Sequence, residues 1–78
     1  MTSDQFNQLS EHDQMEAVLK GTYLADRLTS DHYVRLYNLK NFYVEVFFED
    51  ETQLIDGLRA FEHTLFVLPY LQNLKIAV

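Results

Sequence analysis

The chain has 78 residues, six basic and twelve acidic, with no cysteine, 47% hydrophobic residues and 14% aromatic residues. This length predicts one domain, residues 1–78, and the lack of cysteine excludes disulfides and thiolate metal sites. The net charge of −6 opposes binding to nucleic acid or to anionic membranes. The polar first residues and the short apolar runs predict no secretory signal and no membrane span, so we expect a cytoplasmic protein.

The first predicted element is a helix from Glu11 to Lys20. Ser10 followed by Asp13 has the spacing of a capping box, with an aspartate in place of the usual glutamate. Gly21 suits the left-handed position that often ends a helix. Apolar residues recur on one side of this segment, so we expect the helix to pack by one face.

Three alternating segments follow, and each predicts a strand. Residues 23–28 alternate weakly and precede a turn-prone run, so they form the first strand, with its buried face left open. Residues 33–38 and 42–49 alternate clearly between apolar and polar or aromatic side chains. These last two segments should pair as an antiparallel hairpin.

The hairpin register follows from its loop. A three-residue loop, Leu39 to Asn41, suits a turn whose last residue is left-handed, a conformation that asparagine tolerates. Leu36 then lies opposite Val44 on a buried side. A two-residue loop would set Arg35 opposite Val46 and mix the faces, so this register is rejected. The other face of the predicted hairpin carries Tyr33, Arg35, Tyr37, Tyr43, Glu45 and Phe47.

The last third of the chain is less regular. Residues 54–61 fit a helical stripe slightly better than a strand, and Gly57 within them weakens both structures. Thr64 to Leu74 is typical of a short helix that Pro69 kinks or divides. Lys75 to Val78 could fray.

Several short strings resemble a family of short bacterial proteins of uncharacterised function, over most of the chain. The strings are Gly21–Ala25, Leu36–Tyr37, Phe42–Val46, Ala60–Phe61 and Pro69–Leu71. The segment of that family that matches residues 54–61 is richer in β-branched residues, so the resemblance implies a fourth strand there. It implies no activity. The predicted fold is therefore α+β, with an N-terminal helix, an antiparallel meander of three or four strands and a short C-terminal helix.

The usual signatures of metal and catalytic sites are missing. His12, His32 and His63 each lie beside an acid, but no His or Cys pair has the spacing of a metal site. The acidic run Glu49–Glu51 lacks the EF-hand pattern, so we interpret it as a turn. No phosphate-binding loop, nucleophile elbow or reactive cysteine occurs. We expect no metal, no cofactor, no catalytic residues and no enzymatic activity.

The aromatic face of the predicted hairpin is the strongest candidate for a binding surface. Tyrosine and arginine are frequent at binding hot spots because each combines a large apolar body with a polar tip. A helix covering this face is the competing interpretation. We expect a protein-interaction or regulatory module that acts through this face, through a free sheet edge or by homodimerisation. The alternative is a small-molecule binding or catalytic subunit with its pocket at a dimer interface.

Overall fold

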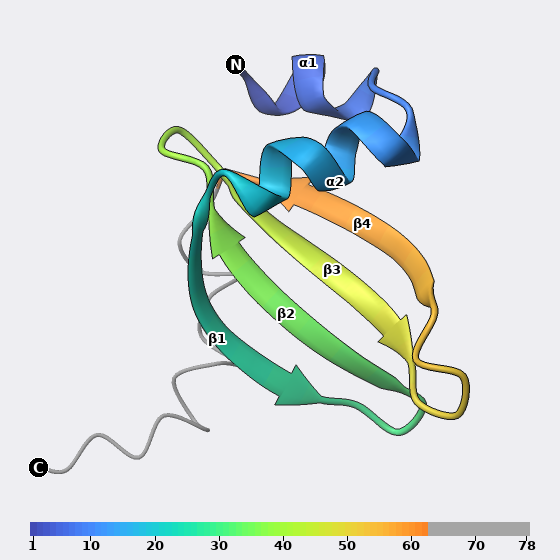
Figure 1. The fold of residues 1–78 in the computed structure, drawn as a ribbon. Coiled ribbons are helices and arrows are strands. Elements are labelled where there is room, and N and C mark those ends of the chain that lie inside the picture. The colour runs from blue at the N-terminus through green and yellow to red at the C-terminus, as the bar shows by residue number, and fades with distance from the viewer. Residues whose placement is uncertain (63–78) are drawn as a thin grey trace, which may run out of the picture.

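The computed structural model describes residues 1–62, which form two short helices and one four-stranded antiparallel sheet (Figure 1). This arrangement confirms the predicted α+β class. The predicted helix Thr64 to Leu74 and the end of the chain, with His63, lie outside the described residues. The elements are α1 (Ser3–Asn7), α2 (Glu11–Leu19), β1 (Thr22–Leu28), β2 (His32–Asn38), β3 (Tyr43–Glu49) and β4 (Ile55–Phe61).

Helix α2 begins where the sequence predicts. The Ser10 hydroxyl accepts a hydrogen bond from the Asp13 backbone N–H at 3.2 Å and so satisfies a donor that the helix leaves free. The prediction for Gly21 is wrong, because no glycine in residues 1–62 has a positive φ. A Cβ atom at Gly21 would instead lie 2.8 Å from the Asn38 carbonyl oxygen and 2.9 Å from Leu39. Glycine is needed here because the end of α2 approaches the β2–β3 turn so closely.

Helix α1 was not predicted, and it is held by a complete capping box. The Thr2 hydroxyl accepts from the Gln5 backbone N–H at 3.1 Å, and the Gln5 side chain accepts from the Thr2 backbone N–H at 2.9 Å. The one buried side chain of α1, Phe6, contacts the Phe42 ring with centroids 5.6 Å apart. A hydrogen bond from Ser3 to Glu62 joins α1 to the end of β4.

The strands follow one another in the order β1-β2-β3-β4, which confirms the meander and its fourth strand. Both edge strands are irregular. Leu24 is an extra residue in β1 opposite β2, and Asp56 is an extra residue in β4 opposite β3. Such β-bulges locally bend the strand and interrupt its ladder of hydrogen bonds.

The predicted hairpin register is wrong, and the rejected one is present. Arg35 lies opposite Val46 and Leu36 lies opposite Glu45. The loop has two residues, Lys40 and Asn41. A hydrogen bond from the Leu39 backbone N–H to the Phe42 carbonyl oxygen, 2.9 Å long, closes it. Lys40, with φ 75°, takes the left-handed conformation, and the Asn38 side chain accepts from its backbone N–H at 2.8 Å.

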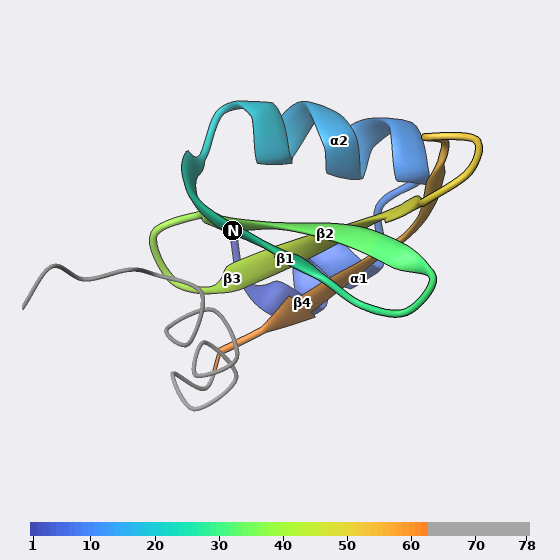
Figure 2. The ribbon, with the colours of Figure 1, turned by 90° about the horizontal axis from the view of Figure 1, so that it is seen from below.

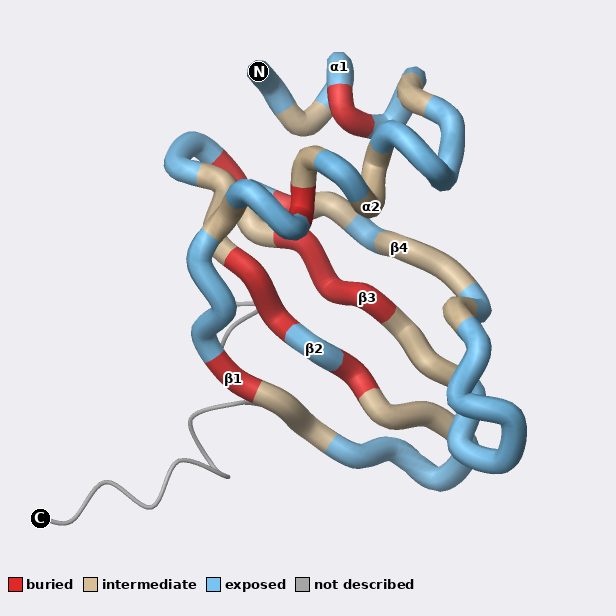
Figure 3. The backbone as a smooth tube through the Cα atoms, viewed as in Figure 1, coloured by how far each residue is buried: buried red, intermediate tan, exposed pale blue. Residues whose placement is uncertain are grey.

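The register prediction failed because the sheet buries apolar side chains on both faces. Figure 2 shows α2 against one side of the sheet, and Figure 3 marks the buried stretches of the strands. The buried residues form two clusters: the first includes Val18 of α2, and strand alternation places the second on the opposite face. The predicted register was chosen so that the apolar residues of both strands share one face. When both faces of a sheet are apolar, this criterion does not distinguish one register from the next. The first cluster contains Phe6, Val18, Tyr37, Phe42, Val44 and Val46, and the second contains Ala25, Val34, Leu36 and Phe61.

Candidate functional site

The six residues of the predicted aromatic face do not share a face. In the observed register Tyr33, Arg35 and Tyr37 pair with Phe48, Val46 and Val44, on the side that α2 covers. The other three predicted residues, Tyr43, Glu45 and Phe47, lie on the opposite side of the sheet, where Tyr43 and Phe47 pack against the second cluster. The single predicted surface is therefore divided between the two faces.

The first of these sides carries an open patch beside α2. Figure 1 shows α2 crossing one end of the sheet, so the other end of this face has no described helix over it. Cross-strand pairs bring five side chains of β1 and β2 together there. We name this group the Tyr–Arg patch: Tyr23, Asp26, Leu28, Tyr33 and Arg35.

The Arg35 guanidinium organises the Tyr–Arg patch. Its carbon atom lies 5.5 Å from the centre of the Tyr23 ring and 5.7 Å from that of Tyr33, within the range of cation–π attraction. The Tyr33 hydroxyl donates to one carboxylate oxygen of Asp26. The other oxygen lies 3.7 Å from Arg35 Nε, which is an ion pair and too long for a hydrogen bond.

Asp26 also changes the acidity of the neighbouring tyrosine. Hydrogen bonding to the Asp26 carboxylate, assisted by burial, raises the pKa of Tyr23 to about 12. A tyrosine phenol is neutral at physiological pH even at its ordinary pKa of about 10, so Tyr23 contributes an uncharged ring, and Arg35 supplies a cation beside it. The patch thus presents aromatic rings, one cation and one anion in a fixed arrangement.

Side chains of the Tyr–Arg patch contact one another, and two members of the patch are also substantially exposed to solvent. Leu28 is 73% exposed and Tyr23 is 49% exposed, although both are large and apolar in body. Sequence analysis found Tyr33 and Arg35 but missed Tyr23, Asp26 and Leu28. It predicted their strand correctly, but the strand alternates too weakly to reveal its buried face, and the bulge at Leu24 interrupts the alternation.

On the opposite face, Glu45 forms the centre of a buried charge cluster. Its carboxylate is 3.0 Å from Arg27 on β1 and 3.9 Å from Arg59 on β4, and the residue is 2% exposed. A buried carboxylate needs such partners, because its transfer from water is costly without them. Tyr43 stacks on Phe61 nearby, with ring centroids 5.5 Å apart. We assign Glu45 and Tyr43 a structural role.

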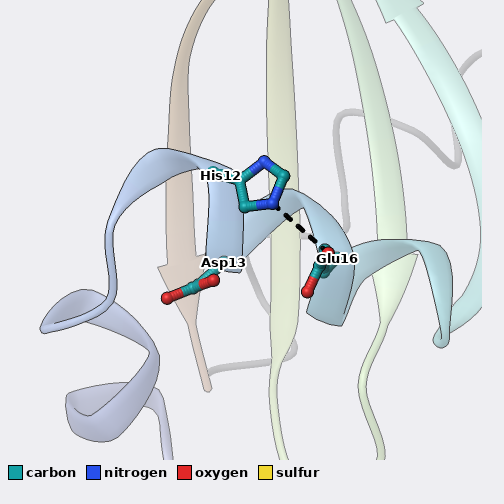
Figure 4. Close-up of side chains that lie close together, drawn as sticks. All are labelled: His12, Asp13 and Glu16. Atoms are coloured by element: carbon teal, nitrogen blue, oxygen red, sulfur yellow. Dashed lines mark ion pairs between the residues drawn. The ribbon is translucent and has the colours of Figure 1, made fainter.

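Three side chains on α2 form a cluster of metal-ligand type (Figure 4). His12, Asp13 and Glu16 each offer an atom within 4.8 Å of the others, and His12 Nε2 lies 3.3 Å from Glu16 Oε1. All three are exposed. Water competes well for such a cluster, and the same contact is an ordinary ion pair between successive helical turns.

His32 is held between two acids at one end of the sheet. Its ring nitrogens lie 3.0 Å from Asp31 and 2.7 Å from Asp56, and its ring meets Phe47 edge-on. Hydrogen bonding to Asp56, with a smaller effect of Asp31, raises the pKa of His32. The contact joins β2 to β4 across β3, so it stabilises the sheet.

A cavity of about 540 Å³ lies between α2 and the β2–β3 turn. This cavity is open to solvent, and its apolar lining residues are Met1, Leu9, Ala17, Leu39 and Phe42. This volume is within the range of ligand pockets, about 300–1,000 Å³. Unlike the pocket expected at a dimer interface, this one is formed within a single chain.

Neither helix among residues 1–62 is long and apolar enough to cross a membrane.

The chain was compared with known proteins by family model, by sequence and by structure. No family model, curated protein or solved structure matches the chain.

Proposed function

We propose that the chain is a small protein-interaction module whose first partner is a second copy of itself. The contact surface in this proposal is the Tyr–Arg patch. The observation that carries it is the arrangement of Arg35 between two tyrosine rings, next to an exposed leucine. Tyrosine and arginine dominate the energetics of many protein interfaces.

Preorganisation supports this role. Side chains that must be ordered on binding each lose conformational entropy, about 0.5–1.5 kcal/mol for a flexible one. In the Tyr–Arg patch, Tyr33 is already held by its hydrogen bond to Asp26, and Arg35 by its ion pair and two ring contacts. Binding therefore orders few additional groups.

The charges of the patch favour self-association in particular. An interface with twofold symmetry buries the same surface on both copies, so that surface must be complementary to itself. The Tyr–Arg patch carries both a cation, Arg35, and an anion, Asp26, together with exposed apolar area. A domain of this size without disulfides also gains stability by sharing buried surface.

The test is a pair of substitutions in the patch, Tyr23→Ser and Leu28→Ser, made together. Both side chains are substantially exposed, so the fold should be retained in the far-UV circular dichroism spectrum. Light scattering of the unmodified protein should give a mass near that of two copies of the 9.2 kDa chain. The double variant should give the mass of one.

The matched control is Leu19→Ser on α2, because Leu19 is 71% exposed and lies outside the patch. This variant should keep the dimer mass. A folded double variant that still dimerises would refute the patch as the interface, and an unmodified protein that stays monomeric at high concentration would refute self-association.

A second candidate is small-molecule binding, which the 540 Å³ cavity favours. We propose binding rather than catalysis for either site. In the part of the chain that the structure describes, Nε2 of His12 and both ring nitrogens of His32 pair with carboxylates, and neither histidine is hydrogen-bonded to a serine or threonine hydroxyl. Nucleophilic catalysis of the common type needs such a pair. We propose no direct partner among nucleic acids or membranes because of the net charge of −6, and none among metal ions because the chain lacks the usual spacing of metal ligands.

A further inference from the structure

The cavity between α2 and the β2–β3 turn lies outside the Tyr–Arg patch and is independent of self-association. Its lining includes the apolar residues Met1, Leu9, Ala17, Leu39 and Phe42, which we call its apolar floor. Phe42 is 2% exposed, so this floor belongs to the packed core. The close approach of Gly21 to Leu39 joins the end of α2 to the turn and keeps the two sides together.

Charged side chains line the rim of the cavity in a definite order. Asp13 and Glu16 belong to α2 and Lys20 is its C-cap residue; spaced three and four residues apart, the three lie along one side of the helix. Lys40 of the turn lines the same cavity. At a rise of 1.5 Å per residue, Asp13 and Lys20 are separated by about 10 Å along the helix.

This order divides the rim into an acidic end and a basic end. The acidic end has Asp13 and Glu16, and the basic end has Lys20 and Lys40. A ligand with a single negative charge would meet the carboxylates as well as the lysines, and a purely apolar ligand would leave all four charges unused. The rim is complementary to a ligand with opposite charges about 10 Å apart and an apolar body between them.

We propose that the cavity binds a free short peptide of about three residues with apolar side chains. An extended chain spans about 3.3–3.6 Å per residue, so a tripeptide separates its charged ends by about 10 Å. Its α-amino group pairs with Asp13 and Glu16, and its carboxylate pairs with Lys20 and Lys40. Its side chains occupy the apolar floor formed by Leu39 and Phe42.

The experiment titrates the purified full chain with the tripeptide leucyl-alanyl-leucine and follows backbone amide shifts by NMR. Ligands of this size reach dissociation constants on the order of 10–100 µM. The largest shifts should fall on residues 16–22 and 38–42. Acetylating the amino end or amidating the carboxyl end should each weaken binding about threefold to fivefold, as expected for partly exposed ion pairs.

One variant and one matched control test the charged rim. Glu16→Gln should weaken binding of the free peptide while leaving binding of the N-acetylated peptide unchanged. Glu11→Gln makes the same change on the same helix, and Glu11 does not line the cavity. It should leave both affinities unchanged.

A third variant tests the apolar floor. Ala17→Trp fills the cavity and should abolish binding in a folded protein. If it unfolds the chain, the Glu16 and Glu11 comparison decides, because both positions are exposed. The proposal is overturned if shifts do not saturate by about 5 mM peptide, or if blocking both ends of the peptide leaves its affinity unchanged.

Discussion

The two glycines of the chain should respond to the same substitution in opposite ways. At Gly21, an added Cβ would lie 2.8 Å from the Asn38 carbonyl oxygen and 2.9 Å from Leu39 Cδ1. Both distances are shorter than side chains ordinarily allow. At Gly57, no described atom lies within 4 Å of the added Cβ. Neither residue has a positive φ, so backbone strain does not enter the comparison.

The expected magnitudes follow from these contacts. Replacing glycine by alanine reduces the entropy of the unfolded chain and stabilises a compatible site by about 0.4–1 kcal/mol, which is the result expected for Gly57→Ala. Gly21→Ala has the same gain but also a steric cost of about 1–3 kcal/mol, because one of its two contacts is with backbone that cannot rotate away. We expect a net loss of about 1–2 kcal/mol.

Urea denaturation followed by circular dichroism measures both variants. In a domain of this size, 1 kcal/mol corresponds to roughly 4–8 °C in the melting temperature, so a thermal scan gives an independent reading. In a Leu39→Ala background, Gly21→Ala should cost less than it does in the unmodified protein but should still destabilise the fold, because the carbonyl contact remains. A Gly21→Ala variant as stable as the unmodified protein would refute the close approach of α2 to the turn.

Three further predictions concern stability. Glu45→Ala should lower the free energy of unfolding by about 3–5 kcal/mol in urea titrations, because it removes the buried carboxylate that pairs with Arg27 and Arg59; a loss below about 1 kcal/mol would contradict the burial of this carboxylate. His32 has a raised pKa in the folded state, so its stabilising contribution is complete below its ordinary pKa of about 6.5 and is lost as the pH rises through the raised value. His32→Gln should therefore flatten the dependence of the urea midpoint on pH in this window, and an unchanged profile would show that its two acidic partners do not contribute. Ser10→Ala should destabilise the protein by about 1 kcal/mol through loss of the α2 cap, whereas equal stability would indicate that water replaces the hydroxyl.

Elements with local determinants could be predicted from the sequence. The start of α2 depends on the Ser10 side chain and the next three residues, and strand β3 on its own alternation. Helix α1 escaped prediction because it has only five residues and one buried side chain, Phe6, which is too few for a periodic pattern. The fourth strand was ambiguous by periodicity and was assigned through the resemblance to a family.

The candidate site depended on information that is not local. Arg35 opposite Val46 looks unfavourable as a pair, but Arg35 lies over the rings of Tyr23 and Tyr33. Glu45 opposite Leu36 looks equally poor, but Arg27 reaches it from two strands away. Because Tyr23 and Arg27 come from β1, outside the hairpin, no argument from the hairpin alone could choose the correct register.

The bulges at Leu24 and Asp56 have a consequence for the protein at high concentration. An edge strand offers unpaired backbone groups to the next molecule, and regular edges allow sheets to grow into fibrils. In the sheet that residues 1–62 form, each of the two edge strands contains an extra residue that interrupts the regular spacing of donors and acceptors. Open-ended polymerisation through strand pairing is therefore disfavoured at both edges, and association of the folded domain is directed to its faces, where it can stop at a closed pair.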